Sequence, residues 1–219
     1  MPFKYALYPG SPERQQEVLN MVNRQSNTAG KTKKMVMLAL LAALIVVLQI
    51  ICTFIKFGPF SITLALAPMI IGAALYGPSA GAFLGFVFGL VVFLTGLFGW
   101  DGGTVNLLMS NSAIGTILIC FVKGTAAGYA SGWVYTLLRK KNRLLAVIVA
   151  GIVCPVVNTG LFILGMFIFF LGTLESWAGG QAMLYYIIVG LTGINFLIEL
   201  FVNIILSSGI TRILKSENK

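Results

Sequence analysis

The sequence predicts an all-α integral membrane protein with six transmembrane helices in one bundle. Of its 219 residues, 58% are hydrophobic and only 10% are charged, whereas a soluble domain is near half apolar and a quarter charged. The apolar runs are continuous and reach the roughly 20 residues that a spanning helix needs. They do not break into the alternating segments of about ten residues that build a transmembrane β-barrel.

The hydrophobic runs place the six spans at about 35–55, 61–76, 79–98, 112–138, 144–171 and 183–211. Residues 1–33 are polar and are expected to form a cytoplasmic tail, which leaves residues 34–219 as the membrane domain. Ser11, Pro12 and Glu13 resemble the start of a helix. The tail is therefore either a short amphipathic helix on the membrane or on a partner, or a disordered segment.

Basic residues gather on one side of this topology. An even number of spans puts both termini on the same side, and that side holds Lys31, Lys33, Lys34, Arg139, Lys140, Lys141, Arg143, Arg212, Lys215 and Lys219. The connections on the other side contain a single cation, Lys56. The positive-inside rule then places both termini in the cytoplasm. Because the basic runs are short and next to the membrane, they indicate topology and lipid contacts rather than nucleic-acid binding.

The sequence contains no histidine, which excludes Ser-His hydrolases and His-ligated zinc or haem. Cys52, Cys120 and Cys154 lie in apolar runs at unrelated spacings, so they indicate neither a metal site nor a disulfide framework. We expect neither a metal nor a cofactor.

Small residues spaced four apart predict close helix packing. The third span carries one glycine ladder and the fourth carries another: Gly81, Gly85, Gly89 and Gly124, Gly128, Gly132. Small residues at this spacing let two helices approach closely, either within the bundle or against a partner. Ala39 and Ala43 form a narrower stripe of the same kind on the first span, with the same two alternatives.

The longest outer connection, residues 98–111, carries polar and aromatic side chains around the flexible pair Gly102-Gly103: Trp100, Asp101, Asn106, Ser110 and Asn111. Tryptophan at this depth often anchors a protein at the membrane interface. A loop of this composition can also close over a pocket as a lid.

A layer of polar residues crosses the middle of the predicted membrane domain. Lys123 lies 11 residues into the fourth span, or about 16 Å deep at 1.5 Å per residue, and counting from the helix ends puts Asn158, Asn195 and Glu199 at a similar depth. A charge here costs about 2.5–3.5 kcal/mol, so Lys123 is expected to face the interior. Lys123 either pairs with Glu199 and fastens two helices, or holds an anionic substrate while the asparagines supply hydrogen bonds. The two roles are compatible if Glu199 orients Lys123 when the site is empty.

Residues from about 35 to 214 resemble the substrate-binding S components of energy-coupling-factor (ECF) vitamin transporters. The resemblance is carried by ALLAA at 39–43, by FGPFSITLALAPMIIGAALYGPSAGAFLGFVFGLV at 57–91 and by the six-helix layout. The second stretch is the most specific, since it combines an outer loop, a short Pro-containing helix, an inner YGP turn and a glycine-rich helix.

This resemblance implies a protein of the bacterial plasma membrane that captures a vitamin or its precursor from outside. It also implies association with a transmembrane T subunit and two cytoplasmic ATPase subunits, which hydrolyse ATP. The family's T-subunit contact corresponds here to Ala39 and Ala43, and the substrate is expected beneath the loops at 56–61 and 99–111.

The sequence looks most similar to the pantothenate-type branch, with the folate type next. Pantothenate has one carboxylate, which suits a single buried Lys123, whereas folate has a large flat ring system that leads us to expect more aromatic residues. The outer aromatics Trp100, Trp177, Tyr185 and Tyr186 do not decide between them, and a cobalamin or pyridoxine-like ligand is also compatible.

Two other classes of protein are disfavoured. A membrane-embedded enzyme needs a nucleophile with a base, or metal ligands, and this sequence has no histidine and one mid-membrane carboxylate. An autonomous carrier usually shows an internal repeat with broken helices, and no convincing repeat relates the two halves.

Overall fold

The computed structural model describes residues 12–57, 60–61, 63–193 and 196–205, which are helical except for short turns and one hairpin. The chain forms two compact units, residues 1–39 and 40–219. All described residues of the first unit belong to α1 (Pro12–Thr53), which is continuous into the second unit. Because residues 12–33 are mostly good helix formers, the helix begins at Pro12 and not near the predicted residue 35. Its side chains from Arg14 to Val22 are exposed.

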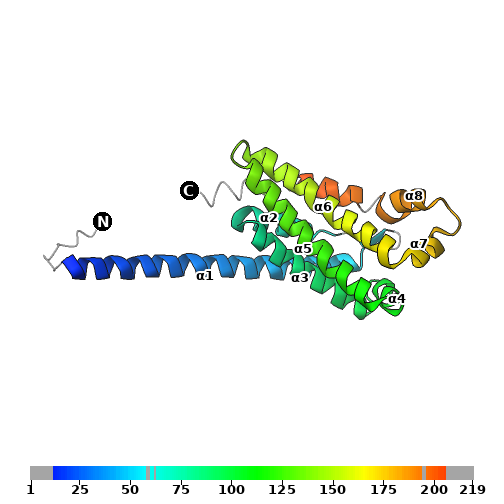
Figure 1. Cartoon of the computed structure of the whole chain (residues 1–219), viewed down its shortest axis with the longest axis horizontal. Coiled ribbons are helices and arrows are strands. Elements are labelled where there is room, and N and C mark those ends of the chain that lie inside the picture. The colour runs from blue at the N-terminus through cyan, green and yellow to red at the C-terminus, as the bar shows by residue number, and fades with distance from the viewer. Residues whose placement is uncertain (1–11, 58–59, 62, 194–195, 206–219) are drawn as a thin grey trace. The chain divides into compact units, whose positions relative to one another are not determined.

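Four further helices build the bundle of the second unit: α2 (Leu66–Tyr76), α3 (Pro78–Leu97), α5 (Ala113–Leu138) and α6 (Arg143–Phe169). Figure 1 shows α3, α5 and α6 side by side. Gly77 adopts a positive φ of 91° between α2 and α3, and Pro78 then starts α3, as proline's missing N–H allows. Asn142 caps α6 by accepting bonds from the N–H groups of Leu144 and Leu145.

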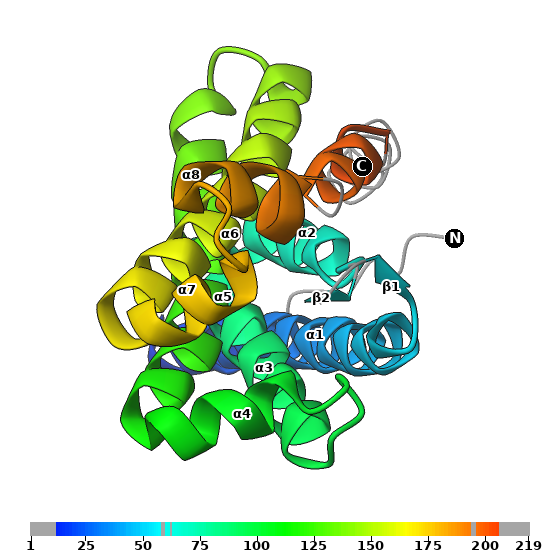
Figure 2. The same cartoon turned by 90° about the vertical axis from the view of Figure 1, so that its right-hand side faces the viewer.

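The second predicted span is shorter than expected. Residues Lys56–Phe57 and Phe60–Ser61 form the antiparallel strands β1 and β2. Ser61 therefore belongs to a strand and not to a helix, and α2 begins at Leu66 rather than near residue 61. Figure 2 views the second unit from the end that carries α4 and α7 and shows the hairpin there.

The predicted outer connection at 98–111 contains a helix, α4 (Thr104–Asn111). Gly102 and Gly103 make the preceding turn at φ values of 87° and 83°, which glycine adopts without strain. The Asp101 carboxylate accepts bonds from the N–H groups of Gly103 at 2.9 Å and Val105 at 2.8 Å. Asp101 thereby caps the start of α4, a role that the lid hypothesis did not include.

The helix type changes within the region of the sixth predicted span. After α7 (Leu171–Ala178) the chain forms α8 (Met183–Tyr185), then a π-helix, η1 (Tyr186–Gly193), and then an α-helix at Phe196–Ile205. Residues 183–193 are helical without a break, and within them residues 186–193 adopt the wider π-helix instead of an α-helix. Such segments are frequent at functional sites. Residues 206–211 of the predicted span lie outside the described residues.

The glycine ladders of α3 and α5 face each other at the closest helix contact of the bundle. A methyl group added to Gly81 would overlap the carbonyl oxygen of Gly128, and one added to Gly85 would overlap that of Gly124. Gly89 is opposed by the backbone of Cys120 in the same way. The backbones therefore touch directly, which is the approach that small residues permit in membranes. Gly132 lies against the backbone of Pro78.

In the described part of the chain, four helices are long and apolar enough to cross a membrane: 28–53, 78–97, 113–138 and 143–169. Two shorter apolar helices, 66–76 and 196–205, occupy the positions of the other predicted spans. This confirms the helical membrane-protein class, and the count of six spans remains a prediction.

Candidate functional site

A cavity lies inside the second unit. Its volume is about 140 Å³, whereas a single buried water needs only about 10–15 Å³ on the same measure. The cavity is therefore large enough for a small organic ligand. It is lined by Gln49, Thr53, Thr63, Phe88, Val92, Thr95, Asp101, Thr104, Val105, Leu108, Thr116, Ile119, Cys120, Lys123, Asn158, Thr159, Phe162, Phe196 and Glu199. The wall thus combines an apolar frame with a few ionic and amide groups, as ligand sites usually do.

Lys123 lines this cavity from α5. Its Nζ atom lies 5.0 Å from the centroid of the Phe162 ring on α6, a distance at which a cation–π attraction holds the ammonium against the ring face. Phe162 also packs against two buried apolar clusters, one containing Ile119 and Met166 and the other Leu174 and Ile187. The ring is therefore held firmly, and it keeps the charge of Lys123 at the cavity wall.

Glu199 lines the cavity from the helix at Phe196–Ile205 and is 5% exposed. Thr63 hydrogen-bonds its carboxyl group through both side chain and backbone, and Lys123 is near enough to act on it electrostatically. No ion pair of 4 Å or less joins Lys123 to Glu199, although the structure describes both residues. The two charged groups thus share a cavity without the direct contact that the fastening hypothesis requires.

Two amide side chains on the wall have an unused hydrogen-bonding atom. Gln49 on α1 is 5% exposed and Asn158 on α6 is 7% exposed. The Oε1 atom of Gln49 and the Oδ1 atom of Asn158 are buried without a hydrogen-bond partner. Leaving such a group unsatisfied costs about 1–3 kcal/mol, and nearly all buried polar groups in proteins have a partner. Both atoms are therefore suited to accept hydrogen bonds from a bound molecule.

The structure brings Lys123, Asn158, Glu199 and Asp101 together at the cavity, but both Asp101 oxygens bind the backbone of α4. The other predicted residues of the outer connection lie off its wall. The Trp100 ring packs against the rings of Phe54 and Phe98, with centroid distances of 5.9 and 6.0 Å. The side-chain amide of Asn106 donates to the carbonyl of Leu97, and that of Asn111 donates to the hydroxyl of Thr173. Asn195 lies outside the described residues.

Several lining residues were missed by the sequence reasoning: Gln49, Thr53, Thr63, Thr95, Thr104, Thr116 and Thr159. The threonines gave no signal, because a threonine in a membrane helix can satisfy its hydroxyl with its own backbone, as Thr53, Thr95 and Thr116 do. Gln49 was predictable from the sequence. It places an amide deep in an apolar helix, as the asparagines do, and should therefore face the interior for the same reason.

Ala39 and Ala43 are exposed, whereas Leu41 and Ile45 on the same helix are buried. The small-residue stripe of α1 is therefore not covered by the described part of the chain. No group of three or more Cys, Asp or Glu side chains in the described ranges is arranged to hold a metal ion.

The sequence matches the family described as "ECF transporter, substrate-specific component" over residues 33–211, which is most of the chain. It is also similar to the pantothenic acid transporter PanT of Lactococcus lactis subsp. cremoris (strain MG1363). The two are 30% identical over 190 residues, an alignment that covers 82% of this chain and 92% of the Lactococcus protein.

Proposed function

The chain belongs to the family of substrate-specific components of ECF transporters, and we propose that it binds pantothenate on the outer side of the membrane for import driven by partner ATPases. Membership in a family of transporter components makes the chain a transporter subunit of the membrane rather than an enzyme. We propose three further points: the identity of the substrate, the side of the membrane from which it is captured, and the partner subunits.

The observation that carries the proposal is a cavity with one ammonium group and two unpartnered amide oxygens. Pantothenate has one carboxylate, two hydroxyl groups, one amide and a dimethyl carbon. Lys123 would bind the carboxylate through a charge-assisted hydrogen bond, and Asn158 would accept a bond from a hydroxyl or amide N–H. The apolar side chains of Val92 and Ile119, which line the same cavity, would face the dimethyl group.

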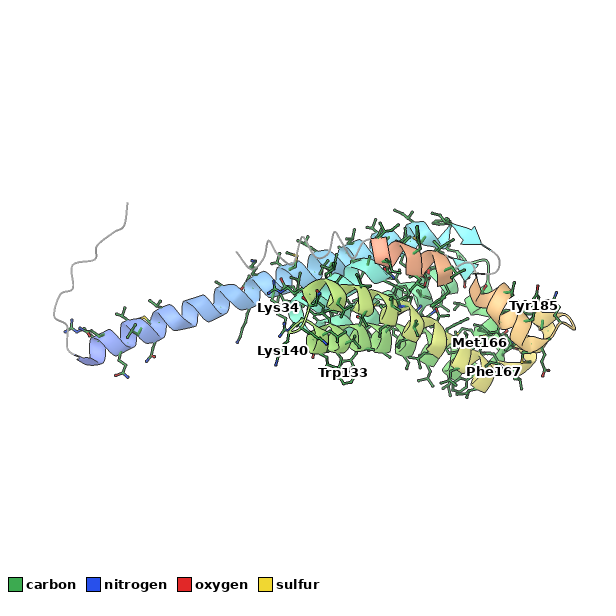
Figure 3. All side chains as sticks on the ribbon, turned by 90° about the horizontal axis from the view of Figure 1, so that it is seen from above. Lys34, Trp133, Lys140, Met166, Phe167 and Tyr185 are labelled. Atoms are coloured by element: carbon green, nitrogen blue, oxygen red, sulfur yellow. The ribbon has the colours of Figure 1, made fainter. Side chains whose placement is uncertain are left out.

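The positions of the cavity and of the basic residues support capture from outside. The cavity is bordered by Asp101 and by Thr104 at the start of α4, near one end of α5. The turn that contains Lys140 is at the other end of α5, and its basic residues are exposed. Figure 3 shows Lys140 and Trp133 at one end of the second unit and Tyr185 at the opposite end. With the basic turn in the cytoplasm, the α4 end faces outward.

Docking to a T subunit fits the exposed small-residue stripe on α1. Ala43 is exposed while Ile45 is buried, so the stripe points away from the bundle's own core and leaves room for a partner helix. The ATPases would act through that T subunit.

The test of the substrate is a thermal-shift screen of the purified protein against water-soluble vitamins. A ligand at a hundredfold over its Kd stabilises the folded state by about 2.7 kcal/mol, so pantothenate is expected to raise the melting temperature by several degrees. A shift with folate, cobalamin or a pyridoxine-like vitamin, and none with pantothenate, would reassign the substrate. If none of the vitamins raises the melting temperature, the proposal is contradicted.

A further inference from the structure

Gln49 stands out on the inner face of α1. The buried residues of this helix that precede it, Leu41 and Ile45, are apolar and follow at spacings of four. Gln49 continues the same stripe but brings an amide into it. Placing an amide in an apolar interior without a hydrogen bond costs several kcal/mol by transfer from water, so packing alone would favour another aliphatic side chain at this position.

The side-chain oxygen of Gln49 is not used within the described part of the chain. The hydroxyl of Thr53 donates to the backbone carbonyl of Gln49 at 2.7 Å, which does not involve the Oε1 atom. The Oε1 atom has no hydrogen-bond partner and is fully buried, while the residue forms part of the cavity wall. Gln49 therefore contributes a buried, unpaired acceptor to the cavity wall from α1, as Asn158 does from α6.

Together with Lys123, these groups describe the ligand chemically. The ammonium of Lys123 matches an anionic group on the ligand. The two amide oxygens, and the Glu199 carboxyl group that Thr63 already hydrogen-bonds, match hydrogen-bond donors elsewhere on the molecule. We infer that Gln49 is a specificity-determining residue that accepts a hydrogen bond from the neutral, hydroxyl- or amide-bearing part of the substrate. This inference rests on the proposed function. A buried acceptor of this kind discriminates against analogues without the donor, because binding them leaves the acceptor unpaired.

The test compares two ligands that differ only at the anionic end. Pantothenol is pantothenate with a hydroxymethyl group in place of the carboxylate, so it keeps the groups that Gln49 is expected to contact. Affinities for both ligands and the melting temperature of the ligand-free protein are measured for the wild type, Gln49→Leu and Lys123→Met. Gln16→Leu is the matched control, because Gln16 lies on the same helix and is exposed.

Gln49→Leu is expected to weaken pantothenate and pantothenol by the same factor, about tenfold, which corresponds to about 1.4 kcal/mol. The melting temperature of the ligand-free protein should stay the same or rise, since an unpartnered polar atom leaves the interior. Lys123→Met should weaken pantothenate far more than pantothenol. Gln16→Leu should change neither affinity.

Unchanged affinity of Gln49→Leu for both ligands would overturn the inference, and so would a loss confined to pantothenate, which would place Gln49 at the carboxylate. If Gln49→Leu does not fold, Gln49→Met repeats the test with an unbranched side chain; failure of both to fold would make Gln49 a structural residue and also overturn it. A wild type that binds neither ligand is a distinct result. It would refute the proposed function first, and the role of Gln49 with it.

Discussion

The ammonium nitrogen of Lys123 on α5 lies 5.0 Å from the centre of the Phe162 ring on α6. This contact explains how a charge can lie inside an apolar bundle without a direct ion pair. The ring face attracts the cation, and the ring itself is fixed by the apolar clusters around it. The ammonium is thus held at the cavity wall while its remaining N–H groups are available to an anionic ligand.

Replacing Phe162 tests whether this contact prepares the site. Phe162→Leu removes the ring face, and we expect pantothenate to bind about two- to thirtyfold more weakly, in line with a cation–π energy of roughly 0.5–2 kcal/mol. Phe162→Tyr keeps a ring and should bind within about twofold of the wild type. Phe167→Leu is the control, because Phe167 lies on the same helix and is exposed. Equal affinity of Phe162→Leu and Phe162→Tyr would show that the ring does not position Lys123.

The contact between α3 and α5 should be intolerant of a single methyl group. In Gly85→Ala, the new Cβ would overlap the carbonyl of Gly124, so the helices must separate, and overpacking of this kind costs typically about 1–3 kcal/mol. Gly160→Ala is the control, since a Cβ there meets nothing within 4 Å. Thermal unfolding in detergent should show a lower melting temperature for Gly85→Ala alone. A melting temperature equal to that of Gly160→Ala would mean that the two ladders are not a close contact.

The exposed stripe on α1 should matter for assembly and not for binding. Ala43→Leu places a bulky side chain on a surface that is free in the isolated chain, so pantothenate affinity should be unchanged. Co-purification with the T subunit and ATPases, and ATP-dependent uptake, should fall at least tenfold. Ala113→Leu, at an exposed position at the start of α5, is the control. Normal assembly and uptake by Ala43→Leu would show that the T subunit does not dock on this stripe of α1.

The sequence was sufficient to predict the helices that are long and apolar, because continuous hydrophobicity is a strong signal. It also led to Lys123, Asn158 and Glu199, since a polar group deep in an apolar run must face the interior. It did not predict the paired strands at 56–57 and 60–61, the cap that Asp101 makes for α4, or the π-helix at 186–193. Each of these depends on local backbone hydrogen bonds, which hydrophobic periodicity does not report.

The positions of Trp100, Asn106 and Asn111 show a second limit. Their polar and aromatic character suggested a lid over the site, but Asn106 and Asn111 are engaged by Leu97 and Thr173. Whether such a side chain faces a cavity depends on the turn that precedes it, here the left-handed pair Gly102 and Gly103. Composition alone does not encode that direction.

The account is tested most directly by calorimetric titration of pantothenate into the purified wild type and into Lys123→Met. Removing the ammonium should weaken binding by at least tenfold, because hydrogen bonds to charged groups are worth about 1.5–3 kcal/mol. The melting temperature of ligand-free Lys123→Met is measured alongside, so that a loss of affinity is read only from folded protein. Equal affinities for pantothenate in the two proteins would contradict the claim that Lys123 binds the substrate carboxylate.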